Sequence, residues 1–365
     1  MSNNPIGLSK EQLDTPHLLL DLDLLEHNID HISSYCQRNG CGWRPHSKAH
    51  KSPDIAHMQL RAGAIGITCA KLSEAEMMVK HGIDHILLAN QLTTQVKWNR
   101  LSQLLERAEV IVSIEDATVL PWAIEAARKG DAIIPIVLEL DIGMGRVGLQ
   151  DIQTAVQLAE QIHQHEAFSF RGLMGYEGHV LDIKPSRQKK AACQKAIAIL
   201  LDCRDALESK GIPCEIISAG GTGSYTYTAA IQGVTEVQAG GGIFMDAKYR
   251  EEFNVENLQI ALRAVTTVTS HRTGQIVTDA GFKTISAHHA PPMVLSHKGI
   301  ALQYLSAEHG VYSVKQDSPL PTLGERLELG LGYTDSTTVL HDRIFGIRAG
   351  TVETIFPLHG RGLLT

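Results

Sequence analysis

The chain has 365 residues, a formal net charge of −7 and a hydrophobic fraction of 43%. Such a chain is long enough for two domains, and its mildly acidic balance argues against general nucleic-acid binding. Its six cysteines form no Cys-x-x-Cys pair, residues 1–12 show no signal-peptide pattern, and no apolar run is long enough to span a bilayer. We therefore expect a cytoplasmic protein with reduced thiols and no membrane partner.

The chain opens with a predicted strand at residues 15–21. Asp21 and Asp23 are suited to cap the helix that we expect at residues 24–37. A further strand is expected at residues 43–46. The strongly polar stretch Arg-Pro-His-Ser-Lys-Ala-His-Lys begins within it and continues past the point where this strand should end.

Lys48 lies in this polar stretch, with Arg44, His46, His50 and Lys51 as possible cationic neighbours. A lysine can form a Schiff base with a carbonyl compound when burial or nearby cations favour its neutral form. At the mouth of a strand in an α/β protein, Lys48 is therefore placed for chemistry on a bound aldehyde. The alternative interpretation is a solvated basic turn.

Apolar, strand-like runs alternate with amphipathic, helix-like segments over the first two thirds of the chain. Strands that are nearly all apolar indicate a parallel sheet with covered faces, and eight such units fit a closed (β/α)8 barrel. An open, doubly wound sheet is the alternative. We expect the barrel domain at residues 22–257. The expected strands are residues 43–46, 63–70, 85–91, 109–115, 133–141, 170–178, 214–221 and 236–244, and the expected helices are residues 53–62, 73–81, 93–108, 117–129, 150–163 and 185–210.

From about residue 258 the sequence changes to short, Val- and Thr-rich runs separated by Gly, Pro and Asp turns. This pattern is typical of an antiparallel β domain. We expect it to comprise residues 258–365 together with residues 1–21. The expected strands are residues 261–270, 275–279, 299–304, 312–314, 325–329, 344–348 and 351–356.

Functional residues of such a barrel lie at the C-terminal ends of its strands. There the turn at residues 220–224, Gly-Gly-Thr-Gly-Ser, offers open backbone N–H groups and two hydroxyls, and the glycines at residues 240–242 add more open backbone. Backbone N–H groups of this kind bind phosphate. The two segments predict a phosphate site between the last two barrel strands, with tight packing at the strand ends as the alternative.

A phosphate site across the barrel from Lys48 indicates pyridoxal phosphate, which would be anchored by its phosphate at one end and by the lysine at the other. Arg146, which follows the fifth barrel strand, can then hydrogen-bond the ring hydroxyl. Tyr176, at the end of the sixth strand, can line the edge of the pyridine ring, although ordinary barrel packing is the alternative.

Six segments carry a family resemblance: RPHSKAHK, GMGRVG, GGTGSYT, AGGGIFMDAKY, TDAGFKTIS and SAEHG, in this order. Together they resemble the D-threonine aldolase and D-serine dehydratase family. This family has the alanine-racemase-like fold, also called fold type III of pyridoxal phosphate enzymes. The resemblance extends from Thr15 to about Gly362.

The resemblance implies roles for particular residues. Lys48 would be the Schiff-base lysine and Arg146 would contact the ring oxygen of the cofactor. It also implies a homodimer, with the active site between the barrel of one subunit and the β domain of the other. The residues implied to hold the phosphate are Thr222, Gly223, Gly241 and Gly242.

The sequence departs from the family in the β domain. Lyases of the family carry a metal-binding His-x-Asp or His-x-Cys, whereas here Tyr333 stands at the histidine position and Asp335 keeps the second position. Tyrosine is a poor ligand for Mn, Mg or Zn unless it ionises. Because Asp335 is retained, we expect it to bind a divalent metal. The alternatives are a metal-free site in which Tyr333 moves the proton, and an ordinary β-turn.

The sequence thus predicts a pyridoxal phosphate-dependent lyase for a small D-3-hydroxy amino acid, acting by retro-aldol cleavage or by loss of the 3-hydroxyl as water. Retro-aldol cleavage needs a base near the 3-hydroxyl, for which His309, Tyr333 and a water on Asp335 are candidates. One alternative is an amino-acid racemase of the same fold, which needs a second base opposite Lys48. Another is a non-catalytic pyridoxal phosphate carrier, which the second domain argues against.

Overall fold

The computed structural model describes residues 4–184 and 186–365. The chain divides into two compact units. The barrel unit comprises residues 32–48, 56–240 and 363–365, and the β unit comprises residues up to 31, 49–55 and 241–362. The domain boundaries expected from the sequence stay a prediction.

The barrel unit is built on a parallel sheet that, within the described residues, has eight strands in the order β2-β9-β8-β7-β6-β5-β4-β3. Strands adjacent in this order pair in parallel, which confirms the predicted fold class. The strands are β2 (Gly42–Trp43), β3 (Ile67–Cys69), β4 (His85–Leu88), β5 (Glu109–Ile114), β6 (Ile134–Glu139), β7 (Phe168–Met174), β8 (Ile216–Ala219) and β9 (Glu236–Val237).

The two ends of this sheet meet. His46, just after β2, forms a parallel bridge with Thr68 of β3. The backbone N–H of Ile65 donates to the carbonyl oxygen of Trp43 at 2.8 Å, and that of Thr68 donates to the carbonyl oxygen of Pro45 at 2.9 Å. These contacts between β2 and β3 close the sheet, so the predicted barrel is correct and the open sheet is not formed.

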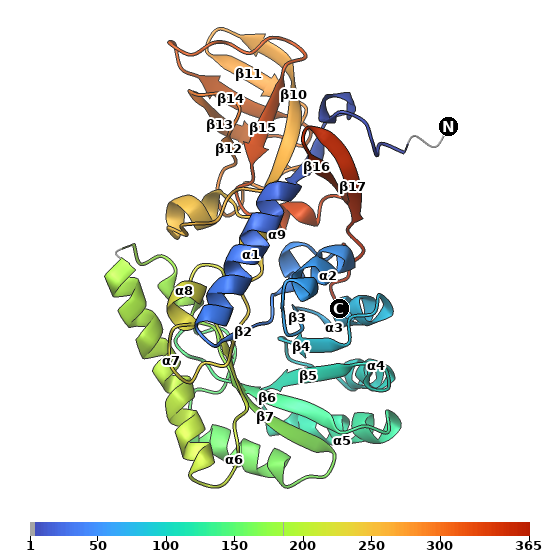
Figure 1. Cartoon of the computed structure of the whole chain (residues 1–365), viewed down its shortest axis with the longest axis vertical. Coiled ribbons are helices and arrows are strands. Elements are labelled where there is room, and N and C mark those ends of the chain that lie inside the picture. Colours follow the sequence, from blue (N-terminus) through green and yellow to red (C-terminus); the bar gives the residue numbers. More distant parts are fainter. Residues whose placement is uncertain (1–3, 185) are drawn as a thin grey trace. The chain divides into compact units, whose positions relative to one another are not determined.

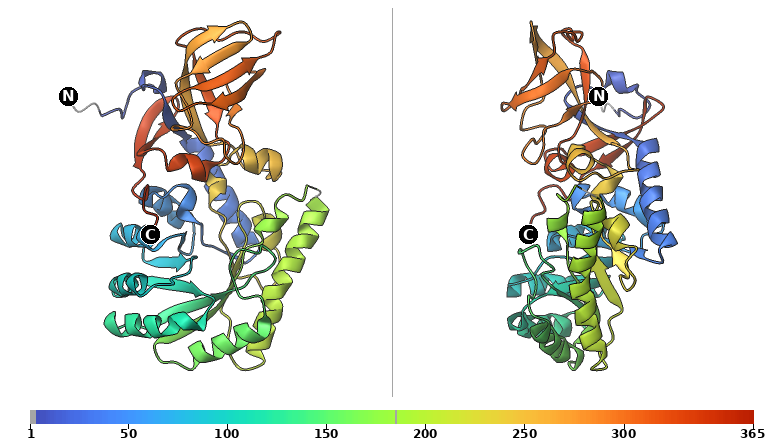
Figure 2. Two further views of the ribbon diagram at one scale, coloured as in Figure 1. Left: turned by 180° about the vertical axis from the view of Figure 1, so that it is seen from behind. Right: turned by 90° about the vertical axis from the view of Figure 1, so that its left-hand side faces the viewer.

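Amphipathic helices follow the barrel strands, as their spacing of apolar residues predicts. Figure 1 shows α3, α4 and α5 in a row beside the strands, and in Figure 2 the long helix α7 lies along the outside of the barrel. The predicted start of this helix, Pro185, lies outside the described residues. The helices are α1 (Leu22–Arg38), α2 (Pro53–Arg61), α3 (Leu72–Lys80), α4 (Gln95–Leu105), α5 (Leu120–Lys129), α6 (Ile152–His163), α7 (Ser186–Glu208) and α8 (Tyr225–Thr228); α1 and α2 each include residues of both units.

Neighbouring parallel strands place apolar side chains together, which is where the barrel gains its stability. A buried cluster on β4 to β8 contains Leu87, Ile111, Val137, Met174 and Ile216. Burying one such side chain stabilises the folded state by about 1.5–3 kcal/mol relative to leaving it in water.

A buried ion pair also joins two parts of the barrel. Arg44, just after β2, forms a bidentate pair with Glu236 on β9.

The β unit contains a mostly antiparallel sheet with the order β13-β14-β11-β10-β1-β16-β17; in addition, β15 pairs with β10, and β12 pairs with β15. Strand β1 pairs antiparallel with β10 and parallel with β16. The two-residue strand β12 and the short helix α9 (Thr334–Thr338) are not predicted by the sequence. The strands are β1 (His17–Asp21), β10 (Leu262–Arg272), β11 (Gln275–Thr278), β12 (Met293–Val294), β13 (Ile300–Leu305), β14 (Gly310–Val314), β15 (Arg326–Gly330), β16 (Arg343–Arg348) and β17 (Thr351–Pro357).

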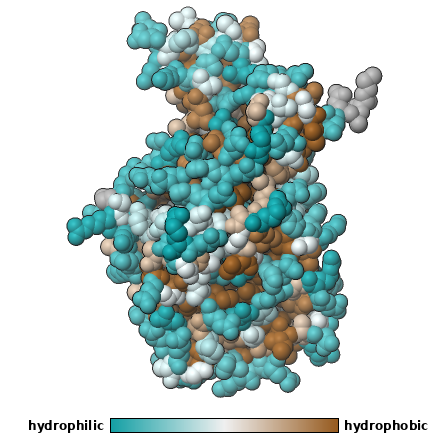
Figure 3. Space-filling view, in the orientation of Figure 1, coloured by the Kyte–Doolittle hydropathy of each residue, from teal (hydrophilic) through white to brown (hydrophobic). Residues whose placement is uncertain are grey.

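Hydrophilic and hydrophobic side chains are interspersed over the face drawn in Figure 3. Among the residues that the structure describes, no helix combines the length and the apolar character needed to cross a membrane. All six cysteines are free, as the sequence predicts.

Candidate functional site

Lys48 lies in a 3-10 turn (Ser47–Ala49), two residues after His46 makes the bridge that closes the barrel. Its backbone N–H faces His46 Nδ1 at 3.4 Å, and its side chain is half-buried. The hydroxyl of Ser47 donates to the buried carboxylate of Glu74 at 2.5 Å. These contacts fix the turn, so Lys48 lies at the C-terminal edge of the barrel, where the sequence predicts it.

Gly240 allows the chain after β9 to approach the end of β2. A Cβ atom at Gly240 would lie 2.1 Å from the carbonyl oxygen of His46, which is far inside van der Waals contact. Only glycine fits this close backbone approach. The glycine therefore helps to define the strand end that carries Lys48.

The turn predicted to bind phosphate lies between β8 and α8. Within it the N–H groups of Ser224 and Tyr225 both donate to the carbonyl oxygen of Gly221, and the N–H of Gly221 donates to Ser224 Oγ at 3.1 Å. Gly223 is buried, and its N–H has no acceptor within residues 4–184 and 186–365. Thr222, beside it, is also buried. A buried donor without an acceptor fits an oxygen of a bound anion.

Tyr176 and Arg146 are brought together in the barrel unit. The Arg146 guanidinium carbon lies 5.9 Å from the centre of the Tyr176 ring, and both residues line a small cavity with Glu139. The Tyr176 ring also borders the phosphate turn, since a Cβ atom at Gly221 would lie 2.9 Å from it. The side chain of Arg146 is exposed, which leaves its guanidinium accessible.

Glu139 adds a carboxyl group to this cavity. It is buried, and it accepts hydrogen bonds from Gln91 Nε2 at 2.5 Å and from Ser113 Oγ at 3.2 Å. Burial raises the pKa of the Glu139 carboxyl against the opposing effect of these two hydrogen bonds. The positive charge of Arg146 also acts to lower this pKa, so the two residues interact electrostatically.

The β unit contains the other predicted residues. Gly241 begins a buried 3-10 turn (Gly241–Ile243), and its N–H has no acceptor among the residues described. A Cβ atom at Gly241 would lie 3.4 Å from the Tyr249 ring and 3.8 Å from Asp335 Oδ1. The hydroxyl of Tyr333 donates to Asp335 Oδ2 at 3.0 Å. The structure thus brings Gly241, Tyr333 and Asp335 into one cluster.

Asp246 ties this cluster together. Its buried carboxylate accepts from the N–H of Tyr249 at 2.9 Å and from the N–H of Thr334 at 3.0 Å. Burial raises the pKa of Asp246 to about 7, and the negative charge of Asp335 adds to this effect. The carboxyl group therefore fixes the start of α9, the helix on which Asp335 lies.

Comparisons with known proteins place this geometry in a family. Residues 20–248 match the family described as "Alanine racemase, N-terminal domain", and residues 261–347 match a serine dehydratase domain. The chain is 34% identical to a D-threonine aldolase of Arthrobacter sp. over 96% of this chain and 93% of that protein. The chain belongs to the D-threonine aldolase and D-serine dehydratase family of lyases, which has the alanine-racemase-like fold.

Two further comparisons agree with this family. The chain is 33% identical to a 3-hydroxy-D-aspartate aldolase of Paracoccus denitrificans, over 98% of this chain and 94% of that protein. The crystal structure of D-threonine aldolase from Filomicrobium marinum superposes with a TM-score of 0.95 at 33% identity, covering 99% of both chains. The family resemblance expected from the six sequence segments is confirmed.

The donor set around Asp335 does not match the metal site of family lyases. The Tyr333 hydroxyl already donates to the Asp335 carboxylate. In the part of the chain that the structure describes, no group of three His, Cys, Asp or Glu side chains could hold a metal ion. A divalent ion at Asp335 would therefore need further oxygen ligands or waters beside this one carboxylate.

His309 is not part of the cluster of Gly241, Tyr333 and Asp335; it lies between β13 and β14, whereas Tyr333 and Asp335 follow β15. It occupies the exposed turn between β13 and β14, where its carbonyl oxygen accepts the N–H of Ser306. Its side chain makes no hydrogen bond or ion pair with any residue that the structure describes. The role of His309 as a base stays a prediction.

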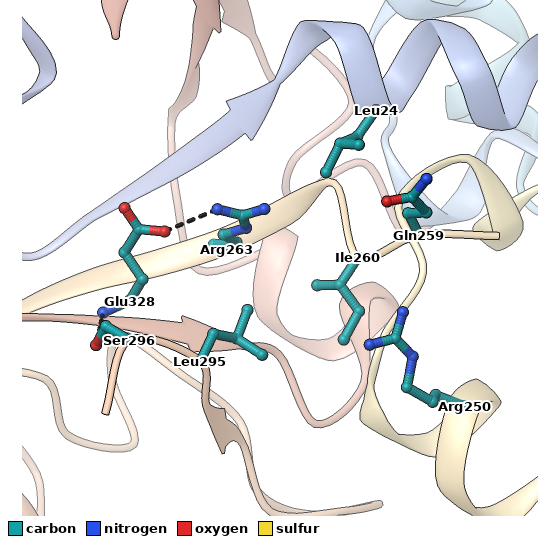
Figure 4. Close-up of a pocket in the computed structure, with 8 residues that line it drawn as sticks. All are labelled: Leu24, Arg250, Gln259, Ile260, Arg263, Leu295, Ser296 and Glu328. Atoms are coloured by element: carbon teal, nitrogen blue, oxygen red, sulfur yellow. Dashed lines mark hydrogen bonds and ion pairs between the residues drawn. The ribbon is translucent and has the colours of Figure 1, made fainter. Parts of the chain in front are cut away.

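A separate pocket of about 290 Å³ lies within the β unit. In Figure 4, Arg263 points toward Glu328, and the two form an ion pair of 2.8 Å. Lys10 pairs with the other oxygen of Glu328 at 2.6 Å. Neither the Tyr333 cluster nor Gly241 lines this pocket. The lining residues are Leu24, Arg250, Gln259, Ile260, Arg263, Leu295, Ser296 and Glu328.

Three residues of these sites are not found by the sequence analysis. His289 stacks edge-on against Tyr333, with ring centres 4.9 Å apart. Asp246 and the buried Glu177 organise turns through hydrogen bonds to distant residues. Asp246 follows the glycines at residues 240–242 and Glu177 follows the end of β7, but a lone acid in a sequence does not reveal what it will contact.

Proposed function

We propose that this protein is a pyridoxal phosphate-dependent aldolase that cleaves a small D-3-hydroxy amino acid between Cα and Cβ. The observation that carries the proposal is the position of Lys48 at the end of the first barrel strand, on the barrel edge that also holds the turn at residues 220–224. The similarity to D-threonine aldolase over nearly the whole chain supports the choice of reaction.

The residues present fit the cofactor. The buried Gly223 N–H without an acceptor suits a phosphate oxygen, and Lys48 supplies an amine at the same barrel edge. When bound, pyridoxal phosphate supplies an electron-withdrawing ring that stabilises negative charge at the Cα atom of an amino acid. Thr222, Gly241 and Gly242 are the further residues that we propose to contact the phosphate.

Arg146 and Tyr176 would act on the ring of the cofactor. The guanidinium of Arg146 is a permanent positive charge with several donors, suited to a hydrogen bond to the ring oxygen. Tyr176 offers the face and edge of an aromatic ring beside the phosphate turn. Together they would orient the ring, while the backbone of the turn binds the phosphate.

Retro-aldol cleavage requires that the 3-hydroxyl of the substrate loses a proton as the Cα–Cβ bond breaks. The hydroxyl oxygen becomes the carbonyl oxygen of an aldehyde, and the bonding electrons remain on Cα, which later receives a proton. We propose that Tyr333 handles the hydroxyl proton. The hydrogen bond from Tyr333 to Asp335 supports this role, because the carboxylate can hold the phenol in place and accept its proton.

Whether a divalent ion binds at Asp335 is tested by experiment and is not part of the proposed mechanism. The sequence predicts that Asp335 binds Mn, Mg or Zn; the described residues offer no group of three His, Cys, Asp or Glu ligands there, and no step here depends on a metal. The homodimer and the cytoplasmic location likewise stay predictions.

A substrate panel tests the proposed function. We expect the purified protein with pyridoxal phosphate to release aldehyde and glycine from D-threonine, and to leave L-threonine intact. Keto acid and ammonia from D-serine would show the dehydratase reaction instead. This reaction is included in the panel because the chain is also 29% identical to a D-threo-3-hydroxyaspartate dehydratase of Delftia sp.. Loss of optical rotation from L-alanine would show a racemase. Bound cofactor without any of these reactions would show a carrier and refute the proposal.

A further inference from the structure

We propose that Glu177 is a positioning residue for the phosphate-binding turn, one that sets how tightly the protein binds the phosphate of its cofactor. The side chain lies three residues after the end of β7 and is fully buried. Its Oε2 atom accepts the N–H of Gly220 at 3.1 Å, and its Oε1 atom accepts the hydroxyl of Thr228 at 2.5 Å. The inference rests on the proposed cofactor and adds a residue that does not touch it.

The two hydrogen bonds of Glu177 join the two ends of the turn. Gly220 is the first residue after β8, and Thr228 is the last residue of α8. Gly220 adopts a φ angle of +73°, in the region that favours glycine. A carboxylate that binds both ends fixes the path of the five residues between Ala219 and Tyr225.

Two neighbours of Glu177 in the sequence, Tyr176 and Leu181, also pack against the turn. The Tyr176 ring packs where a Cβ atom at Gly221 would be, at 2.9 Å, and Leu181 packs in the same way at Gly223, at 2.7 Å. Three successive parts of the turn are therefore held by the chain that follows β7. The Gly223 N–H, which has no acceptor in the described part of the chain, belongs to this turn.

The buried carboxyl group of Glu177 is not compensated by a positively charged partner among the described residues. Among the described residues it forms no ion pair, and both of its donors are neutral. The thiol of Cys193 is a further neighbour, and burial together with the charge of Glu177 raises the pKa of that thiol to about 12. A buried carboxyl group held only by neutral donors costs folding free energy, which is expected where the group serves a function.

Two substitutions separate hydrogen bonding from charge. In Glu177→Gln, the amide oxygen can accept the Gly220 N–H while the amide nitrogen donates to Thr228 Oγ1, so both contacts are kept without a charge. Glu177→Ala removes both contacts. Thr228→Val keeps the shape of the threonine and removes only the second contact, which provides a variant if Glu177→Ala fails to fold.

The measurement is the dissociation constant of the apo-protein for pyridoxal phosphate and for pyridoxal, which lacks the phosphate. We expect Glu177→Ala to weaken pyridoxal phosphate binding by about tenfold to 100-fold, as the loss of one or two buried hydrogen bonds predicts. Pyridoxal binding should change by less than about threefold. Glu177→Gln should restore tight binding, and Thr228→Val should lie between the two.

The outcomes separate the inference from the proposed function. If the wild-type protein binds no pyridoxal phosphate, the proposed function fails. If it binds pyridoxal phosphate tightly but Glu177→Ala, or Thr228→Val in its place, weakens both ligands equally or neither, Glu177 is a structural residue and only this inference fails. A Glu177→Gln variant as weak as Glu177→Ala would overturn positioning by hydrogen bonds.

Discussion

Removing the carboxylate of Glu236 should destabilise the barrel strongly. Glu236 and Arg44 are 2% and 6% exposed, and three hydrogen bonds of 2.9–3.1 Å join them. Glu236→Gln leaves the Arg44 guanidinium buried without a countercharge. Breaking a buried ion pair in this way costs about 3–5 kcal/mol, far more than the loss of an exposed pair.

Urea unfolding monitored by tryptophan fluorescence provides the assay, since Trp43 lies on β2 beside this pair. The matched control is the double variant Arg44→Met/Glu236→Leu, which removes both charges and should unfold within about 2 kcal/mol of the wild type. A Glu236→Gln midpoint equal to that of the wild type would refute the reasoning. So would a double variant that is less stable than the single one.

Three other predictions concern the cofactor, the proton and the β unit. Arg146→Ala should shift the visible absorbance of the cofactor and its pH dependence; unchanged spectra with weaker substrate binding alone would contradict the assigned role. Tyr333→Phe should lower turnover at least about 100-fold, the usual contribution of a general acid or base. Treatment of the wild-type protein with EDTA tests the metal: activity that survives supports the metal-free route, whereas activity that is lost and then restored by Mn supports a metal at Asp335. At Glu328, burial acts to raise the pKa but the hydrogen bonds from basic side chains outweigh it and lower the pKa. Its stabilising effect is therefore fully present above pH 4.5 and is lost progressively as the pH falls further, so Glu328→Gln should cost about 1 kcal/mol at pH 7 and progressively less below pH 4.5.

Much of the fold follows from the order of apolar runs and amphipathic segments. Eight nearly apolar strands predict a covered parallel sheet, and the structure forms it. The lengths of strands are predicted less well. The expected strand at residues 236–244 is only Glu236–Val237, because the apolar run continues into glycines that form a 3-10 turn. Thr334–Thr338 is a short helix where the sequence also fits a β-turn, because Asp246 binds the N–H of Thr334.

Some residues of the candidate site can be predicted from the sequence and others cannot. Lys48 and the turn at residues 220–224 are predictable, since both follow strand ends and the ends of parallel strands share one edge of the barrel. Glu177 and Asp246 are not, because their partners lie 51 and 88 residues away in the sequence. Their burial, which makes these contacts strong, is a property of the folded chain alone.

The position of the cofactor is the central claim, and reductive trapping tests it most directly. Borohydride treatment of the protein with pyridoxal phosphate, followed by peptide mass spectrometry, should give one labelled peptide with the label on Lys48. Lys48→Ala should abolish the label together with nearly all turnover. A label on Lys51 or Lys71, or an unlabelled protein that still cleaves its substrate, would contradict the account.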